Sequence, residues 1–353
     1  MLDWPTDDGE IGVRTLVGST GGATHSKVVL YNSKGEKLVE CSGPGTNHWI
    51  LGMEECQKRI HSMVDQAKKE AGLPIDKPLT ILGMSLSGCE QEETNHKLKQ
   101  GLLSKYPKLS LQYMVCSDTV GSIATALDKG GIVVIAGTGS NALLLNPDGS
   151  VHRCGGWGHM LGDEGSAWWT AHKAMKICID EQDNFVQPPH STNFVWEAIK
   201  RHFNVETRFD LLDHCYSNFE KSKYAGLTKL LSEGANQGDA LCLWLFARAG
   251  EMLFKHISAL YSMADKSLLQ ESGGLSVVCV GSVWLSWEHL KPGFTGHCSH
   301  PGMPAIPELT LLRLTTSMAA GATYLAAKEI DLNLPRDYQA NYKVFFHYKC
   351  SKT

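Results

Sequence analysis

Residues 131–180 read GIVVIAGTGSNALLLNPDGSVHRCGGWGHMLGDEGSAWWTAHKAMKICID, and this stretch decides how the rest of the chain is interpreted. The β-branched run 132–136 stops at GTGS, residues 137–140, and resumes over residues 142–145. The turn NPDG, residues 146–149, completes a predicted hairpin, because proline presets φ and glycine tolerates the conformations that close a turn. The bend 137–140 has no bulky side chain, so its backbone N–H groups and two hydroxyls can close on an anion such as a phosphate.

Two glycine-rich loops follow this hairpin. Residues 155–159 read GGWGH, where only glycine permits close approach of the backbone, and residues 162–166 read GDEGS. We expect Asp163 and Glu164 to open the next helix, since the helix dipole favours acidic side chains in the first turn by about 0.3–1 kcal/mol. Each piece alone is equally compatible with a plain hairpin, loop or N-cap. Their density within one short span favours a binding site.

The composition is that of an ordinary globular protein. A chain of 353 residues is long enough for two domains, and 42% hydrophobic with 20% charged residues argue against disorder. The formal net charge of -4 gives no electrostatic footprint for nucleic acid or an anionic membrane. Eleven cysteines are scattered without a CxxC pair. Free thiols in a reducing compartment fit this pattern, so we predict a cytoplasmic protein.

The plan of the central hairpin occurs twice. Residues 14–40 read RTLVGSTGGATHSKVVLYNSKGEKLVE: a strand, a bend of small residues, a second strand, and a turn that opens with asparagine and closes with glycine. Residues 132–151 follow the same order. A plan used twice in one chain predicts two similar α/β halves that face each other across a cleft.

Polar residues follow the predicted strands of the first half. Asn47 and His48, in the loop CSGPGTNHW, offer donors and acceptors to a polyol, although Asn47 is equally suited to cap the next helix. Asp118 follows the strand 111–116, at the edge of an α/β sheet where ligands gather. The alternative role of Asp118 is to satisfy the N–H groups of the helix it opens.

Helical periodicity dominates the second half of the chain. Apolar residues recur at helical spacing over residues 194–203, 209–219, 224–233 and 239–263, and a buried strand spans residues 275–280. Residues 291–307 hold four prolines and three glycines and are predicted to form a loop. A last strand, 309–314, leads into a helix over residues 316–330, and the residues beyond 334 are predicted to be a docking tail.

The motifs that are absent narrow the chemistry. The chain has no GxxxxGK[ST], no GxGxxG after a strand and no catalytic loop of the protein-kinase type. It offers two Gly/Thr bends and a strand-end aspartate. Phosphoryl transfer needs groups that hold phosphates, a metal ion, and a base that accepts a hydroxyl proton, and Asp118 suits the base.

Six motifs in this order resemble the N-acetylglucosamine kinases, in the sugar-kinase branch of the actin, hexokinase and Hsp70 superfamily. The motifs are TNHW (46–49), SLSG (85–88), DTVGSIATA (118–126), GTGSN (137–141), GGWGHMLGDEGSA (155–167) and CVGSVW (279–284). The resemblance implies an α/β fold of two ribonuclease H-like domains around a central cleft. We place the first domain at residues 1–128, with the tail 335–353 docking back on it, and a larger second domain at residues 129–334.

The resemblance also implies roles for individual residues. Asp118 would be the base that deprotonates the sugar 6-hydroxyl, with ATP as the donor, Mg²⁺ as its ion, and a homodimer as the assembly. The residues implied as sugar contacts are Asn47, Gly156, Trp157, Gly158 and Asp163. The residues implied to bind ATP are Thr24 and Thr138 at its phosphates and Ala225, Ser282 and Ser286 at its nucleoside. No residue is assigned to the metal.

Thr20 departs from the family pattern. The family's first phosphate bend usually has an acidic residue where this chain has Thr20, and that carboxylate helps to hold the magnesium shell. Residues 1–17 also do not match the family's usual beginning. One alternative is therefore a catalytically impaired relative that binds the sugar without turning it over. A second alternative is an ATPase that activates a dehydratase, which needs an iron–sulfur cluster held by cysteines.

Overall fold

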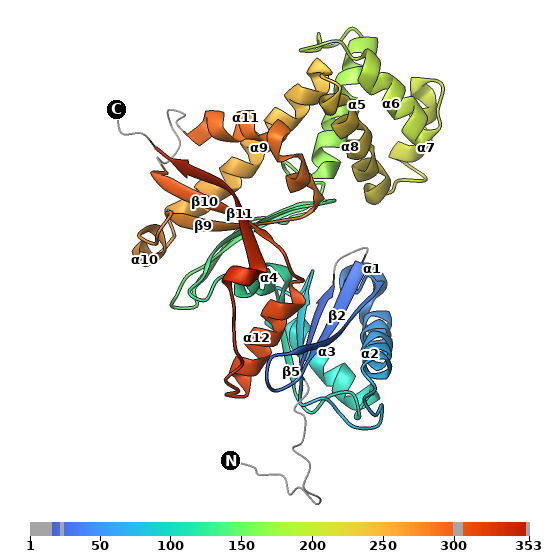
Figure 1. The fold of residues 1–353 in the computed structure, drawn as a ribbon. Helices are drawn as coiled ribbons and strands as arrows, with labels where there is room; N and C mark the ends of the chain where they lie inside the picture. Colours follow the sequence, from blue (N-terminus) through green and yellow to red (C-terminus); the bar gives the residue numbers. More distant parts are fainter. Residues whose placement is uncertain (1–15, 22–24, 299–305, 351–353) are drawn as a thin grey trace, which may run out of the picture. The chain divides into compact units, whose positions relative to one another are not determined.

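The computed structural model describes residues 16–21, 25–298 and 306–350 and divides the chain into two compact units. Unit 1 comprises residues up to 128 together with 314–343, and unit 2 comprises 129–313 together with the residues from 344 onward. Both units contain a mixed sheet with helices packed on it (Figure 1). Within the described residues, no helix is both long and apolar enough to cross a membrane.

Unit 1 is built on a five-stranded sheet in the order β3-β2-β1-β4-β5. The first three strands are antiparallel neighbours, whereas β4 and β5 continue the sheet in parallel with β1. Every residue of β4 is buried, as expected for a strand covered on both faces. The strands are β1 (Leu16–Gly21), β2 (His25–Tyr31), β3 (Lys37–Pro44), β4 (Ile81–Leu86) and β5 (Tyr113–Ser117).

Glycines allow α12 (Ala319–Glu329) to pack closely within unit 1. A Cβ atom on Gly83 of β4 would stand 2.3 Å from the carbonyl oxygen of Ala322, and one on Gly321 would stand 2.1 Å from the carbonyl oxygen of Gly121. The backbone of α12 therefore lies directly on the sheet and on α4. The other helices of unit 1 are α1 (His48–Leu51), α2 (Met53–Glu70), α3 (Glu92–Lys105), α4 (Asp118–Ala126) and the short η3 (Gln339–Asn341).

Unit 2 repeats this plan in a six-stranded sheet in the order β11-β10-β9-β6-β7-β8. Antiparallel β6, β7 and β8 take the places of β1, β2 and β3, and β9 and β10 follow in parallel. The prediction that one plan is used twice is confirmed. The strands are β6 (Gly131–Ala136), β7 (Ser140–Leu145), β8 (Val151–Gly155), β9 (Leu275–Val280), β10 (Glu308–Leu314) and β11 (Tyr342–Lys349).

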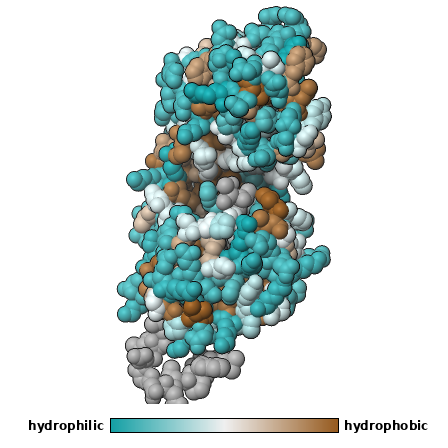
Figure 2. All heavy atoms as spheres, turned by 90° about the vertical axis from the view of Figure 1, so that its right-hand side faces the viewer, coloured by the Kyte–Doolittle hydropathy of each residue, from teal (hydrophilic) through white to brown (hydrophobic). Residues whose placement is uncertain are grey.

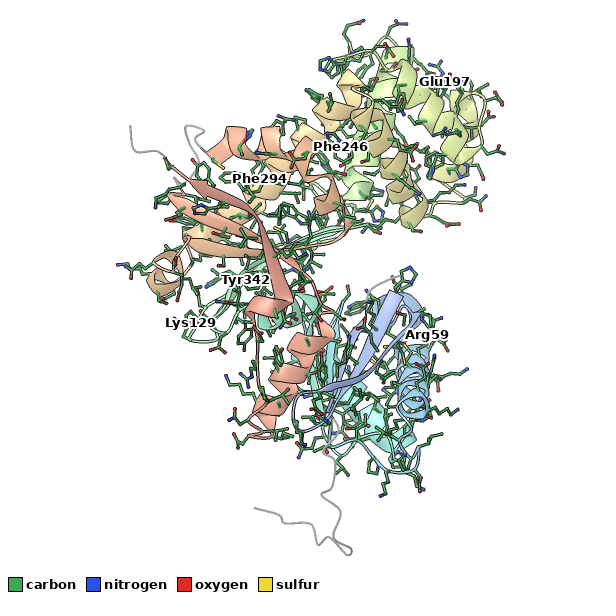
Figure 3. All side chains as sticks on the ribbon, in the orientation of Figure 1. Arg59, Lys129, Glu197, Phe246, Phe294 and Tyr342 are labelled. Carbon is green, nitrogen blue, oxygen red and sulfur yellow. The ribbon has the colours of Figure 1, made fainter. Side chains whose placement is uncertain are left out.

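A large helical layer completes unit 2. Phe246 of α9 and Phe294 of α11 are fully buried in its core (Figure 3). Helices α5 to α8 form a group at one end of the unit (Figure 1). The helices are α5 (Ala167–Gln182), α6 (Asn193–Phe203), η1 (Arg208–Asp210), α7 (Leu211–Cys215), α8 (Lys221–Asn236), α9 (Ala240–Tyr261), α10 (Lys266–Leu269), η2 (Ser282–Ser286) and α11 (Trp287–Cys298).

On the face shown in Figure 2, hydrophilic side chains predominate and hydrophobic ones form small groups.

The structure corrects three sequence predictions. The predicted loop 291–307 begins inside α11, because Trp287, Leu290 and Phe294 are buried along one side of a helix that tolerates Pro292. The helix predicted over residues 209–219 is limited to η1 and α7.

The third correction concerns the domain boundaries. Residues 314–334 belong to unit 1, where α12 packs, and not to the second domain. The tail does not dock wholly on unit 1, because β11 is the edge strand of the unit 2 sheet.

Candidate functional site

Three strand ends align in unit 1. Gly21 at the end of β1 pairs with Leu86 of β4, and Leu86 pairs with Ser117 of β5. Asp118 comes directly after Ser117 as the first residue of α4, and its side chain is half-buried. The carboxylate predicted as a base therefore stands at the carboxyl edge of the sheet, where parallel strands present their ligand-binding groups.

The start of α4 is fixed by serine side chains. Ser117 caps the helix, with its Oγ accepting a hydrogen bond from the N–H of Val120 at 3.3 Å. The hydroxyl of Ser85 donates to the carbonyl oxygen of Ser117 at 3.2 Å. This junction holds the backbone of Asp118 in register with the end of β4.

Asn47 has the capping role that the sequence left open. Its Oδ1 accepts from the N–H of Trp49 at 2.9 Å, which makes it the N-cap of α1, while its Nδ2 lies 3.5 Å from the hydroxyl of Ser87. The indole of Trp49 donates to the carbonyl oxygen of Gly88 at 3.1 Å. The TNHW and SLSG motifs are thus packed together at the end of β4. His48 is buried beside them, and burial lowers the pKa of its imidazole.

The second bend, at residues 137–139 between β6 and β7, is joined to the start of α5. The N–H of Gly137 donates to the carbonyl oxygen of Gly139 at 2.9 Å. The N–H groups of Ala167 and Trp168 donate to the carbonyl oxygens of Gly137 and Thr138 at 2.9 and 3.3 Å. Thr138, predicted to bind phosphate, therefore lies at the tip of a bend that is tied to a helix N-terminus.

Asp163 does not open α5 as the sequence suggested, because Ser166 caps that helix. Asp163 instead has a φ of 67° and points into the bend, where its Oδ1 accepts the N–H of Ser140 at 3.0 Å. The Nζ of Lys221, at the start of α8, lies 2.6 Å from its Oδ2. This carboxylate is only 3% exposed, so the ion pair with Lys221 lies largely out of contact with solvent on the side of Asp163.

Gly139 makes this approach possible. A Cβ atom on Gly139 would stand 2.5 Å from Asp163 Oδ1 and 2.9 Å from Lys221 Nζ. Gly139, which the sequence predicted as part of a phosphate-binding bend, is therefore also needed because any larger residue would clash with the buried carboxylate of Asp163. Lys221 was missed, because the pairing of a loop with a distant helix leaves no local sequence pattern.

The GGWG loop has the backbone freedom that its glycines predicted. Gly156 and Gly158 both have a φ of 77°, and the guanidinium of Arg153 donates to the carbonyl oxygens of Gly155 and Gly156. The same guanidinium lies 5.0 Å from the ring centroid of Trp157, which is 66% exposed. The guanidinium of Arg153 therefore contacts the Trp157 ring, and most of the side chain is exposed to solvent.

Asn141 is a second polar residue that sequence reasoning did not assign to the site. A Cβ atom on Gly156 would stand 2.7 Å from Asn141 Oδ1. This oxygen is buried and has no hydrogen-bond partner among the described residues. The GTGSN motif was the available signal, since it places this amide directly after the bend.

Of the predicted nucleoside residues, Ser282 lies next to the same bend. Gly281 packs against it, since a Cβ atom there would stand 2.2 Å from the carbonyl oxygen of Ala136, and Ser282 follows Gly281. The hydroxyl of Ser286 lies 3.2 Å from that of Ser232 on α8. Ala225 is buried on α8 one turn after Lys221. In unit 2, Thr138, Asp163 and Gly281 with the following Ser282 therefore lie at one bend. Thr24 lies outside the described residues.

A separate apolar pocket of about 380 Å³ lies in the helical layer of unit 2. None of the predicted site residues lines it. Its walls come from α5, α7 and α8 and include Met175, Leu211 and Tyr224. Over the described part of the chain, no group of three or more His, Cys, Asp or Glu side chains is arranged to hold a metal ion.

Comparison with known proteins gives concordant results. Residues 17–291 match the model of the BadF/BadG/BcrA/BcrD ATPase family. An N-acetyl-D-glucosamine kinase from Dictyostelium discoideum is 23% identical over 69% of this chain and 78% of its own length. An N-acetylmuramic acid/N-acetylglucosamine kinase from Clostridium acetobutylicum is 23% identical over 90% of this chain and 100% of its own.

Solved structures agree on the fold. A candidate N-acetylglucosamine kinase from Chromobacterium violaceum has a TM-score of 0.70 at 24% identity, over 89% of this chain and 99% of that one. A ROK hexokinase from Thermus thermophilus has a TM-score of 0.54 at 14% identity, over 90% of this chain and 99% of its own. These likenesses confirm the predicted α/β fold of the actin and hexokinase type.

Proposed function

Because the chain belongs to the BadF/BadG/BcrA/BcrD ATPase family, we propose that it is an ATP-dependent kinase that phosphorylates the 6-hydroxyl of N-acetylglucosamine. The names of its relatives from Dictyostelium discoideum and Clostridium acetobutylicum support this substrate. Such an activity would serve the salvage of amino sugars.

The observation that carries the proposal is the buried carboxylate of Asp163. One of its oxygens accepts the N–H of Ser140, directly after the bend at residues 137–139, which we call the phosphate bend. The other is paired with the ammonium of Lys221 at 2.6 Å. A carboxylate has about four acceptor sites, so these two contacts leave capacity for the donor that a sugar hydroxyl would supply. In this proposal, the bend and Asp163 together serve both phosphate and sugar binding.

The remaining residues have the roles that the family resemblance implies. Asp118 accepts the proton of the 6-hydroxyl as it attacks the terminal phosphate, a task for which a positioned carboxylate is suited. Asn47, Gly156, Trp157 and Gly158 contact the sugar. Thr24 and Thr138 hydrogen-bond the phosphates of ATP, and Ala225, Ser282 and Ser286 line its nucleoside. A site that hydrogen-bonds the acetamido group rejects sugars that lack it, because its polar groups would be left unpaired.

We propose that Mg²⁺ enters with the nucleotide. The described residues offer no cluster of carboxylates and histidines for the ion. Mg²⁺ commonly uses one or two protein oxygens, with substrate phosphates and water completing its shell. In that mode of binding the nucleotide contributes most of the ligands.

We also propose that the protein works in the cytoplasm and as a homodimer. No disulfide joins the cysteines of the described residues, and most of these cysteines are buried, which suits a reducing compartment. The homodimer rests on the family resemblance alone, and light scattering at several concentrations would measure it.

A turnover assay with a panel of sugars tests the substrate. We expect ADP release with N-acetylglucosamine to exceed that with glucosamine or glucose by at least tenfold in kcat/KM. ATP hydrolysis that is unchanged when the sugar is omitted would contradict the proposal and favour an ATPase that does not act on sugars. Binding of sugar without any turnover would instead identify an impaired relative.

A further inference from the structure

Lys221 occupies a position that its own helix does not favour. It is the first residue of α8, a helix of 16 residues, where the N–H groups and the helix dipole disfavour a cation. Its placement is explained by Asp163, whose Oδ2 lies 2.6 Å from the ammonium. The lysine is therefore held at this point by the carboxylate and not by the helix.

The ammonium of Lys221 lies directly against the phosphate bend. A Cβ atom on Gly139 would stand 2.9 Å from Nζ, so no side chain of the bend separates the ammonium from its backbone. The side chain of Lys221 is 31% exposed, whereas that of Asp163 is 4% exposed. Within this ion pair, the ammonium is therefore accessible to solvent and the carboxylate is buried.

The hydrogen-bonding capacity of this ammonium is not used up. An ammonium has three donors. The contact with Asp163 Oδ2 at 2.6 Å engages one of them. The other donors of Lys221 are available to an anion at the bend.

We propose that Lys221 contacts the terminal phosphate of the bound nucleotide and stabilises the charge that develops on it during transfer. This inference rests on the proposed kinase function and adds a catalytic residue to it. A preorganised cation beside a transferring phosphoryl group is a recurring means of lowering that barrier. Asp163 has two tasks in this account, since it accepts from the sugar and orients the cation.

The test compares nucleotides that differ by the terminal phosphate. Binding of AMP-PNP, ADP and N-acetylglucosamine is measured by calorimetry on the full chain and on Lys221→Met and Lys221→Arg. We expect Lys221→Met to weaken AMP-PNP about 10- to 100-fold and ADP less than threefold, and to lower kcat. Lys221→Arg should recover at least part of the AMP-PNP affinity, because it keeps the charge.

Lys223→Met is the matched control. Lys223 lies two positions further along α8, but its Nζ is 3.4 Å from Nδ1 of His214 and not at the bend. Its removal should leave the ratio of AMP-PNP to ADP affinity unchanged. Should Lys221→Met not fold, Lys221→Gln gives the same comparison, since it keeps a donor for Asp163 without the charge.

Two results would overturn the inference. If Lys221 only held Asp163 in place, its variants would weaken the sugar and leave the AMP-PNP to ADP ratio as in the wild type. Equal losses of AMP-PNP and ADP would likewise exclude a contact with the terminal phosphate. Because these affinities need no turnover, a wild type that binds AMP-PNP but does not phosphorylate N-acetylglucosamine would refute the proposed substrate and leave the role of Lys221 testable.

Discussion

Gly139→Ala tests whether the phosphate bend and the buried carboxylate depend on each other. The added Cβ would stand 2.5 Å from Asp163 Oδ1 and 2.9 Å from Lys221 Nζ, so the carboxylate must move. Overpacking of this kind costs about 1–3 kcal/mol of folding free energy. A carboxylate moved off its position also loses a charged hydrogen bond to the sugar, worth about 1.5–3 kcal/mol, which raises the sugar Kd about 10- to 150-fold.

Gly137→Ala is the control for this prediction. Gly137 belongs to the same bend, its φ is not positive, and a Cβ atom there would meet nothing within 4 Å. Urea unfolding gives the free energy of unfolding of both variants, and calorimetry without nucleotide gives their sugar affinity. We expect Gly137→Ala to stay within about 0.5 kcal/mol of the wild type. Equal behaviour of the two variants in both measurements would refute the coupling of the bend to Asp163.

Three further predictions concern other parts of the molecule. Gly293→Ala should lower the free energy of unfolding by several kcal/mol in urea, because the new Cβ would stand 1.7 Å from the carbonyl oxygen of Ala247. Gly296→Ala is the control in the same helix. Its Cβ would meet nothing within 4 Å, so it should raise the free energy of unfolding by up to about 1 kcal/mol. Burial lowers the pKa of His256 below the usual 6.5, so as the pH falls the unfolded state binds a proton before the folded state does. The contribution of His256 to stability should be full above pH 6.5 and decrease as the pH drops below that value. In thermal melts at pH 5 to 7, His256→Gln should show a weaker dependence of stability on pH. Thr20→Asp should raise kcat at limiting Mg²⁺, because it restores a hard oxygen to the metal side; an unchanged rate would show that this position is not needed.

Much of the fold follows from local sequence pattern. Hydrophobic periodicity and turn residues predicted β6, β7 and β9 to within about two residues, because each is a buried run bounded by glycine or asparagine. The proline in α11 was misleading, since a local helix breaker was overridden by the burial of Trp287 and Phe294. Packing between distant segments decided that helix, and packing leaves little trace in a short window.

The same limit applies to the site. The glycines of the bend and of the GGWG loop could be predicted, because they lie close together in the sequence and their backbone freedom is a property of the residue itself. The small residues of α12 indicated close approach to another backbone but not to which sheet, so its domain was misassigned. The pairing of Asp163 with Lys221 could not be predicted, because it joins a loop to the start of a helix far along the chain.

The most direct test of the whole account is the product formed by the wild type and by Asp118→Asn. Incubated with ATP, Mg²⁺ and N-acetylglucosamine, the wild type should form the 6-phosphate, identified by phosphorus and proton magnetic resonance. Asp118→Asn should bind the sugar within about tenfold but turn it over about 10²- to 10⁴-fold more slowly, since it lacks a general base. A phosphate on another hydroxyl, or a variant as fast as the wild type, would contradict the role of Asp118.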